Sequence, residues 1–399
     1  MLQVEEAQQK ILSVAAALGI ETVLLREAAG RVLAQSIVAS ISLPRFDNSA
    51  MDGYAVRAAD VANVTASSPV MLRRIGAVAA GAIFEGRVEP KTCVRLFTGS
   101  PLPAGADAVV MQEDTRASGE TIEVLDAVKP WENIRLAGED VKQGSTIARV
   151  GERLDAARLA LPGAVGVGNV EVSIRPRVGI LSTGNELIEA GATLQPGQIY
   201  ESNRAAIAAL VTNVGGIARV FPLVADSLEA TQQALRSAFA ECDVVVSTGG
   251  VSVGEYDLVK QAFESIGGTH EFWQVAMKPG KPFLFGRLGG KFLFGLPGNP
   301  VSAFVTFLML ARPALLKMQG AEELSLPAHP GTLAEPLHNR GARRHFMRVS
   351  VDATGQVRSA GLQASHALGT LARANGLVNV PAETLWPAGT AVQVLRWGY

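Results

Sequence analysis

Apolar runs and amphipathic segments alternate through the middle of the chain. Short runs with the character of buried strands lie near residues 178–181, 218–223, 244–247, 271–275 and 292–294. Segments with helical periodicity fill the gaps and begin near Ser202, Ser227, Asp257 and Pro300. Alternating strands and helices are typical of a sheet that helices cover on both faces. The pattern therefore predicts a doubly wound α/β layer, which we place at residues 177–325.

The region before this layer shows another pattern. An amphipathic helix is predicted from about residue 4 to residue 18, and a short helix around residues 155–161. Between residues 43 and 139, β-like runs alternate with turns rich in Gly and Pro. That alternation indicates a small β-rich domain.

The C-terminal region is again β-like. Residues 345–351 and 356–359 flank an Asp-Ala-Thr-Gly turn and predict a hairpin. Residues 377–380 and 390–395 predict further strands. The fold class is therefore α/β plus β in several domains.

Composition narrows the class of protein. The 399 residues are 48% hydrophobic, which is enough for several domains with cores of their own. The 36 basic and 37 acidic residues nearly cancel, so no overall field favours nucleic acid or a membrane surface. The first residues lack the pattern of a signal peptide, and the longest apolar stretch, residues 301–311, is too short to span a bilayer. We expect a cytoplasmic protein that binds neither nucleic acid nor membrane.

Several kinds of site are missing from the sequence. Cys93 and Cys242 are too few for a disulfide framework or a cysteine-rich zinc site. The five histidines have no ligand spacing. Neither a G-x-x-x-x-G-K-[ST] motif nor a G-x-G-x-x-G motif after a strand occurs. The missing motifs therefore argue against a P-loop NTPase and against a dinucleotide-dependent dehydrogenase.

A glycine-rich segment follows one predicted strand. Residues 247–257 read Ser-Thr-Gly-Gly-Val-Ser-Val-Gly-Glu-Tyr-Asp and lead into a helix. Such a turn places free backbone N–H groups and a positive helix end at one spot, which suits an anion. Similar turns at residues 182–186 and 295–300 follow two other predicted strands. Chain reversal explains each turn alone, whereas the three together favour one anion site at the carboxyl edge of the sheet.

Acidic residues accompany these turns. Glu186 follows the first turn, Asp226 opens a helix, and Glu255 and Asp257 close the segment at 247–257. Carboxylates at an anion-binding edge are costly unless a cation joins them, which points to Mg²⁺ shared with a phosphate. Helix capping is the alternative interpretation of Asp226 and Asp257.

Two lysines lie on a constrained turn after another predicted strand. Lys278 and Lys281 belong to the sequence Lys-Pro-Gly-Lys-Pro. Ammonium groups on a turn with little freedom can clamp phosphate or oxyanion oxygens. Exposed turns also carry lysine for solubility, although a merely solvated lysine does not require the flanking prolines.

A set of motifs along the chain resembles one family. Residues 43–55, Leu-Pro-Arg-Phe-Asp-Asn-Ser-Ala-Met-Asp-Gly-Tyr-Ala, resemble the signature of the molybdopterin molybdenumtransferases, the MoeA family, also found as the E domain of gephyrin. Arg45 stands where relatives usually carry proline. Further motifs follow in the family's order over almost the whole chain, at residues 98–110, 135–140, 182–187, 247–257, 278–282, 296–302, 365–366 and 374–376.

The resemblance implies four domains and a homodimer. Residues 1–44 and 141–176 would form an elongated N-terminal domain, and residues 45–140 a β-rich domain inserted into it. Residues 177–325 would be the molybdopterin-binding α/β domain with the molybdenum-cofactor-synthesis fold, and residues 326–399 a C-terminal β-barrel-like domain. In the implied homodimer, the active cleft is composite, and Asp52 and Thr98 reach it from the other subunit.

The resemblance also implies a reaction. Adenylylated molybdopterin binds, its phosphoanhydride is hydrolysed with Mg²⁺, and molybdate enters the dithiolene while AMP is released. An upstream adenylyltransferase would supply the substrate, and downstream molybdoenzymes would receive the product. These anions agree with the anion site predicted from the three glycine-rich turns.

The candidate residues fall into three groups. The catalytic candidates are Asp52, Thr98, Glu186, Asp226 and Asp257. The Mg²⁺ candidates are Glu186, Asp226 and Asp257. The substrate-binding candidates are Ser182, Thr183, Gly184, Gly249, Gly250, Ser252, Gly254, Lys278, Lys281, Pro297, Gly298, Pro300 and Ser365.

Two other functions stay open. The same α/β fold could adenylylate molybdopterin, although residues 1–170 and 326–399 would then have no obvious purpose. A non-catalytic scaffold of the gephyrin type is the second alternative. Retention of the acidic and lysine positions argues against it.

Overall fold

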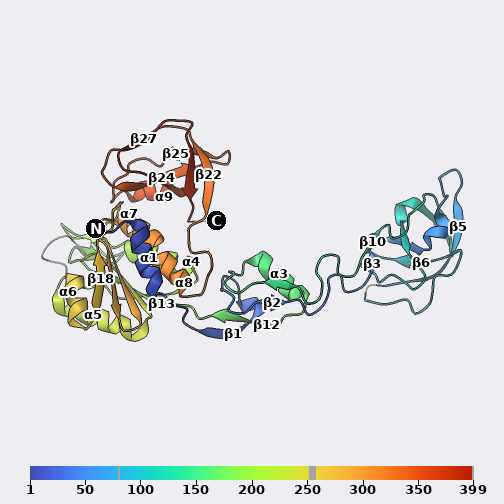
Figure 1. Cartoon of the computed structure of the whole chain (residues 1–399), viewed down its shortest axis with the longest axis horizontal. Coiled ribbons are helices and arrows are strands. Elements are labelled where there is room, and N and C mark those ends of the chain that lie inside the picture. The colour runs from blue at the N-terminus through green and yellow to red at the C-terminus, as the bar shows by residue number, and fades with distance from the viewer. Residues whose placement is uncertain (80, 251–257, 398–399) are drawn as a thin grey trace. The chain divides into compact units, whose positions relative to one another are not determined.

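The computed structural model describes residues 1–79, 81–250 and 258–397. The chain forms two compact units (Figure 1). The first unit comprises Met1–Gln35, Val150–Asp155 and Asn169–Tyr399, and the second comprises Ser36–Arg149 and Ala156–Gly168. The finer division into four domains stays a prediction.

A six-stranded sheet forms the centre of the first unit. Its strands run in the order β16 (Ile217–Val220), β13 (Arg177–Ser182), β17 (Val244–Thr248), β21 (Lys291–Leu296), β20 (Leu284–Leu288) and β18 (Thr269–Trp273). The first four are parallel, and β20 is antiparallel to both of its neighbours. The predicted α/β layer is confirmed, with an antiparallel strand added within it.

Helices cover both faces of this sheet. Val245 and Leu293 pack into a core with α5 (Leu228–Glu241) and α6 (Leu258–Ser265). Val244 and Val246 point to the opposite core. That core is shared with α1 (Val4–Val14), α4 (Asn203–Asn213), α7 (Pro300–Thr306), a π-helical turn (Phe307–Ala311) and α8 (Arg312–Lys317). Because successive side chains of a strand point to opposite faces, these continuous apolar runs supply both cores.

The N-terminal helix is shorter than predicted. It ends at Val14 instead of residue 18. Lys317 Nζ donates to the carbonyl oxygen of Leu12 at 2.7 Å, and the Leu18 N–H donates to the carbonyl oxygen of Met318 at 3.0 Å. These bonds to the end of α8 satisfy backbone groups that a longer helix would have paired internally.

The sequence pattern missed β20. Gly286 interrupts its apolar run, and a Cβ atom there would lie 2.4 Å from Phe263 Cε1 and 3.0 Å from the Thr269 carbonyl oxygen. The strand therefore needs glycine so that β18 and α6 can pack closely against it. The predicted helix start at Asp257 lies outside the described residues.

A closed sheet forms the C-terminal part of the first unit. Its five strands pair in a ring, in the order β24 (Arg344–Val351), β25 (Gln356–Ser359), β22 (Ala328–Leu333), β28 (Ala391–Leu395) and β26 (Gly376–Val380). β24 and β25 form the predicted hairpin, and β26 and β28 lie close to the predicted strands. β19 (Met277–Lys278) joins β24, and α9 (Leu368–Arg373) follows β25. The β-barrel-like C-terminal part is confirmed.

The second unit contains the predicted β-rich part. Its main sheet has the order β7 (Ala108–Met111), β4 (Gly53–Val56), β6 (Thr92–Leu96), β5 (Val70–Ala77), β9 (Thr121–Val124) and β8 (Thr115–Ser118). One face packs around Cys93 and Val110, and the other around Val94 and Val109. The remaining elements of this unit are β2 (Ile37–Val38), β3 (Asn48–Ser49), α2 (Ala58–Val61), a 3₁₀ turn (Gln112–Asp114), β10 (Ile134–Arg135), β11 (Thr146–Ala148) and α3 (Ala156–Ala164).

Smaller elements complete the first unit. These are β1 (Ile20–Leu24), a 3₁₀ turn (Leu25–Glu27), β12 (Asn169–Ser173), β14 (Leu187–Ile188), β15 (Ile199–Tyr200), β23 (Leu337–Asn339) and β27 (Thr384–Trp386). β1 pairs with β12, β14 with β15 and β23 with β27.

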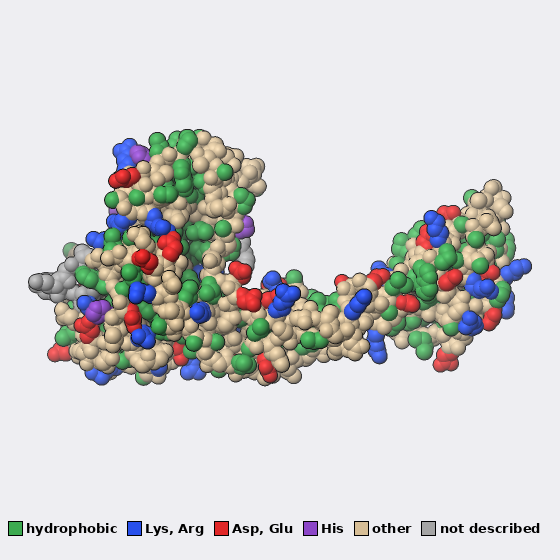
Figure 2. All heavy atoms as spheres, in the orientation of Figure 1, with side chains coloured by type: hydrophobic (Ala, Val, Ile, Leu, Met, Phe, Trp, Pro, Cys, Tyr) green, Lys and Arg blue, Asp and Glu red, His purple; other side chains and the backbone are tan. Residues whose placement is uncertain are grey.

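Among the described residues, one helical span is long and apolar enough to cross a membrane. Pro300–Lys317 has a mean hydropathy of 1.3, and 72% of it is buried inside the protein. A buried core helix has the same composition, so the span is weak evidence for a membrane segment. On the face drawn in Figure 2, basic and acidic side chains are interspersed over each unit.

Candidate functional site

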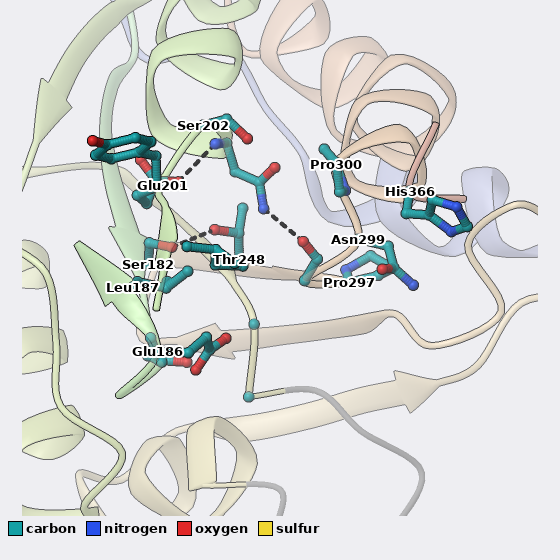
Figure 3. A pocket seen from close by; sticks show the side chains of 18 of the residues that line it. Ser182, Glu186, Leu187, Glu201, Ser202, Thr248, Pro297, Asn299, Pro300 and His366 are labelled. Atoms are coloured by element: carbon teal, nitrogen blue, oxygen red, sulfur yellow. Dashed lines mark hydrogen bonds between the residues drawn. The ribbon is translucent and has the colours of Figure 1, made fainter. Parts of the chain in front are cut away.

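A cavity of about 890 Å³ lies where three parallel strands end (Figure 3). β13, β17 and β21 each run into one of the predicted turns. The turn residues that line the cavity are Ser182, Thr183, Gly184, Thr248, Gly249, Gly250, Pro297, Gly298, Asn299 and Pro300. Carboxyl ends of adjacent parallel strands form the usual ligand crevice of an α/β sheet. The structure therefore brings the three turns together, as the single-site interpretation expects.

The turns at Thr183 and Gly249 touch through their backbones. A Cβ atom on Gly249 would lie 2.5 Å from the Thr183 carbonyl oxygen, and one on Gly250 would lie 2.6 Å from Val259 Cγ2. Both glycines have positive φ, 83° and 66°. Only glycine fits this approach without strain, so both positions need it for the cavity wall.

Hydroxyl groups form the buried floor of the cavity. Thr248 Oγ1 and Ser182 Oγ lie 3.1 Å apart in a hydrogen bond. The Thr183 hydroxyl is also buried but has no hydrogen-bond partner among the described residues. Because buried polar groups are normally paired, Thr183 offers a hydrogen-bonding position to a group in the cavity.

Two acidic candidates line the same cavity. Asp226 and Asn185 are joined reciprocally: the Asn185 N–H donates to Asp226 Oδ2 at 3.2 Å, and the Asp226 N–H donates to Asn185 Oδ1 at 3.0 Å. Glu186 is exposed, and its carboxylate lies against Gly184, where a Cβ atom would come within 2.8 Å of Oε2. Figure 3 shows Glu186 and His366 on opposite sides of the cavity.

The carboxylates of Glu186 and Asp226 are ligands that suit Mg²⁺. Magnesium sites often use one or two carboxylates completed by phosphate oxygens and water. Within residues 1–79, 81–250 and 258–397, no group of three His, Cys, Asp or Glu side chains is placed to hold a metal. Asp257, the third Mg²⁺ candidate, lies outside the described residues, as do Ser252 and Gly254.

A charged cluster behind the cavity was not predicted. Glu201 lines the cavity and caps α4, because its Oε1 accepts from the N–H groups of Asn203 (2.7 Å) and Arg204 (2.9 Å). Arg204 is buried and donates to Glu201 Oε2 at 3.0 Å, to Glu189 Oε2 at 2.6 Å and to the Phe221 carbonyl oxygen at 2.7 Å. Burial alone would lower the pKa of Arg204, but the bonds and charges of Glu189 and Glu201 together outweigh it and raise this pKa. The residue pattern marked only a helix start at Ser202, whose side chain forms no capping bond.

Asn203 was also missed as a cavity residue. Its side-chain Nδ2 donates to the Gly298 carbonyl oxygen at 2.8 Å. The two residues are far apart in sequence, and nothing in a local pattern signals their contact. The remaining unpredicted lining residues are Leu187, Ile199, Tyr200, Glu201, Ser202, Thr248, Leu258, Pro282, Asn299, His366 and Leu368.

Three substrate-binding candidates do not line the cavity. Lys278 is exposed on β19, which pairs with β24 at His345. Lys281 precedes Pro282, a lining residue. Ser365 precedes the lining residue His366, and its carbonyl oxygen accepts from the Val301 N–H at 3.1 Å.

Asp52 and Thr98 lie together in the second unit. Asp52 Oδ1 accepts hydrogen bonds from the Thr98 N–H at 2.8 Å and from the Thr98 hydroxyl at 2.9 Å. These bonds lower the pKa of Asp52, with a smaller contribution from Arg95. Their contribution to the cavity from another subunit stays a prediction.

Comparison with known proteins identifies the family. Family models match residues 2–166, described as MoeA N-terminal region (domain I and II), residues 179–317, described as probable molybdopterin binding domain, and residues 330–397, described as MoeA C-terminal region (domain IV). Together they cover most of the chain.

Full-length relatives agree. Molybdopterin molybdenumtransferase 2 of Mycobacterium tuberculosis is 40% identical over 401 residues, covering 99% of each chain. Molybdopterin molybdenumtransferase of Haemophilus influenzae is 37% identical over 390 residues, covering 96% of this chain and 95% of the relative.

Solved structures share the architecture. The crystal structure of the molybdopterin biosynthesis MoeA protein from Pyrococcus horikoshii OT3 has a TM-score of 0.85 and 31% identity, covering 99% of this chain and 100% of that chain. The order of the matched regions confirms the resemblance found in the sequence. The chain therefore belongs to the molybdopterin molybdenumtransferase (MoeA) family, a family of enzymes of molybdenum cofactor biosynthesis.

Proposed function

We propose that this protein inserts molybdate into the dithiolene of adenylylated molybdopterin, with Mg²⁺-dependent hydrolysis of the phosphoanhydride and release of AMP. The observation that carries the proposal is one cavity that joins three backbone turns at the carboxyl edge of the sheet to Glu186 and Asp226. The M. tuberculosis and H. influenzae relatives are named molybdopterin molybdenumtransferases, which supports the transfer of molybdenum to molybdopterin in this proposal.

The binding step follows from the cavity walls. The Gly249–Gly250 and Pro297–Pro300 turns line the cavity where an anion would bind, and the Thr183 hydroxyl supplies a buried hydrogen-bonding atom. The N–H groups of Thr183 and Gly184 already donate to the carbonyl oxygens of Thr248 and Val224, so the first turn contributes this hydroxyl. Lys281 and Ser365 each precede a residue that lines the cavity, and together with Lys278 they would receive the second anion, molybdate. The volume of about 890 Å³ is in the range of pockets for ligands of nucleotide size.

Glu186 and Asp226, together with Asp257, would hold Mg²⁺ in this proposal. When bound, the ion would offset phosphate charge and polarise the phosphoanhydride. The hydrogen bonds with Asn185 hold Asp226 just before the N-terminus of α5. Asp52, supported by Thr98, would complete the site from the partner copy of a homodimer.

The proposed reaction depends on other enzymes for its substrate and for the use of its product. A separate adenylyltransferase would supply the substrate, and molybdoenzymes would receive the finished cofactor. We place the protein in the cytoplasm, with no nucleic acid or membrane as partner.

AMP release from adenylylated molybdopterin tests the function. With Mg²⁺ and molybdate, the purified protein is expected to release AMP and to reconstitute an apo-molybdoenzyme. Glu186→Gln and Asp226→Asn should each slow release by about 100-fold. Glu229→Gln is the matched control, because Glu229 is exposed on α5 and does not line the cavity.

The adenylyltransferase and the scaffold predict other results, which incubation with ATP and molybdopterin separates. Formation of adenylylated pterin from ATP and molybdopterin by the protein alone would support the adenylyltransferase. A folded protein that neither releases AMP nor consumes ATP would support a scaffold. A wild-type rate in both carboxylate variants would contradict the assigned roles of Glu186 and Asp226.

A further inference from the structure

The guanidinium of Arg348 holds the chain at residues 362 and 364. Arg348 lies on β24 and is 0% exposed. Its Nη2 donates to the carbonyl oxygens of Leu362 at 2.6 Å and Ala364 at 3.1 Å, and its Nε donates to the Thr370 hydroxyl at 3.1 Å. One buried side chain thus ties the segment 362–364 to the first turns of α9.

The backbone of Arg348 reinforces this attachment. Its N–H donates to Gln363 Oε1 at 3.0 Å, and its carbonyl oxygen accepts from Gln363 Nε2 at 2.8 Å and from the Ala360 N–H at 3.0 Å. The Thr370 hydroxyl in turn donates to the Leu362 carbonyl oxygen at 3.0 Å. These bonds attach the segment after β25 to β24 at several points.

The burial of this charge is costly for stability alone. The acceptors of the Arg348 side chain among the described residues are two carbonyl oxygens and one hydroxyl. Burial lowers the pKa of Arg348. Apolar residues of similar volume often replace buried ionic groups without loss of stability, so the arginine is better explained by the backbone geometry that its planar fork imposes.

The segment that Arg348 holds reaches the cavity. The Ser365 carbonyl oxygen accepts from the Val301 N–H at 3.1 Å, in the first turn of α7. His366 and Leu368 line the cavity, and Figure 3 shows His366 near Pro300. Arg348 itself does not line the cavity.

We propose that Arg348 is a positioning residue that docks the segment 362–366 on α7 and so sets the rim of the cavity at His366. The inference rests on the proposed function, because it concerns the site of the proposed substrate. It goes further because it assigns a role to the C-terminal closed sheet, which would position the part of the cavity wall at His366.

Hydrogen exchange of the free protein tests the attachment directly. In Arg348→Lys, the charge remains but the planar fork is lost, so the amides of residues 362–371 should exchange about tenfold faster, as expected for loss of a charge-assisted hydrogen bond. Amides of β22 and β28 should not change. Thr370→Val, which removes the hydroxyl acceptor with little change of shape, should show a smaller increase in the same amides.

Val357→Ala is the matched control for general loss of stability. Val357 lies in the core of the same closed sheet and is 0% exposed, and it makes none of the bonds to the segment. Its exchange should rise across the sheet and not selectively at residues 362–371. Unchanged exchange at 362–371 in Arg348→Lys, or an equal selective rise in Val357→Ala, would overturn the proposal.

Kinetics of AMP release give the second readout. Arg348→Lys should raise KM for adenylylated molybdopterin about tenfold and leave kcat within about twofold, since only binding geometry is altered. Faster exchange with an unchanged KM would overturn the positioning role. If wild-type protein releases no AMP, the proposed function fails, whereas the exchange result still decides whether Arg348 holds the segment.

Discussion

The side-chain amide of Asn203 donates a hydrogen bond to the carbonyl oxygen of Gly298 over 2.8 Å. It joins the first turn of α4 to the turn that follows β21, and both residues line the cavity. The bond fixes the distance between the start of α4 and the turn after β21, two parts of the cavity wall that are far apart in sequence. Glu201 holds the same end of α4 through two backbone N–H groups.

Asn203→Ala should weaken AMP binding more than it weakens folding. Loss of this one exposed hydrogen bond corresponds to about 1 kcal/mol, or about a fivefold rise in Kd. Calorimetric titration with AMP and thermal unfolding measure the two effects. Asn213→Ala, at the exposed end of the same helix, is the control and should leave Kd unchanged; equal Kd values for both variants would contradict the role of the bond.

Gly249→Ala should cost more stability than Gly289→Ala. Both glycines have positive φ, 83° and 59°, so both substitutions introduce backbone strain of about 1–2 kcal/mol. At Gly289 the new methyl group meets nothing within 4 Å, whereas at Gly249 it meets the Thr183 carbonyl oxygen at 2.5 Å. Urea unfolding should show an added loss of about 1–3 kcal/mol for Gly249→Ala, together with loss of AMP binding. Equal losses of unfolding free energy in the two variants would show that the Thr183 carbonyl can move away from the new methyl group at no cost.

Thr98→Val should raise the pKa of Asp52 toward its ordinary value. The hydroxyl bond is removed while the Thr98 N–H bond remains. A depressed carboxyl pKa contributes stability above the unfolded-state value, and this contribution is lost as the pH falls through the folded-state value. NMR titration of the Asp52 carboxyl carbon measures the shift. Thr98→Ser keeps a hydroxyl and should retain the low pKa, and an unchanged pKa in Thr98→Val would assign the effect to the backbone alone.

Acid should destabilise the first unit through His345. Burial, with Lys278, Arg348 and Arg343 nearby, lowers the pKa of His345 to about 3. Between about pH 6.5 and pH 3 the unfolded chain binds a proton that the folded state does not, so stability rises with pH by up to about 1.4 kcal/mol per unit. His345→Gln should flatten the slope of unfolding free energy against pH in this range.

His329→Gln is the control for that slope. His329 is exposed on β22, and the change of slope in His345→Gln should exceed any change in His329→Gln. An unaltered slope in His345→Gln would mean that His345 is protonated in the folded state.

Residue patterns predicted the elements whose signals are local. The apolar runs of β13, β17 and β21 and the helix start at Pro300 lie as expected, because burial on both faces requires continuous apolar residues and proline suits a first helical turn. The pattern failed where a distant contact decides. The end of α1 depends on Lys317, and β20 depends on the fit of Gly286 against Phe263.

The sequence by itself determined the family, the α/β layer and the three turns that meet at the cavity, because each depends on residue types in consecutive order. Only the tertiary structure decided which side chains share one wall. Asn203 meets Gly298, Arg204 draws Glu189 and Glu201 together, and Arg348 holds the segment before His366. These contacts join residues between 3 and 95 positions apart, and the longer ones are set by the packing of whole helices and strands, which no local pattern contains.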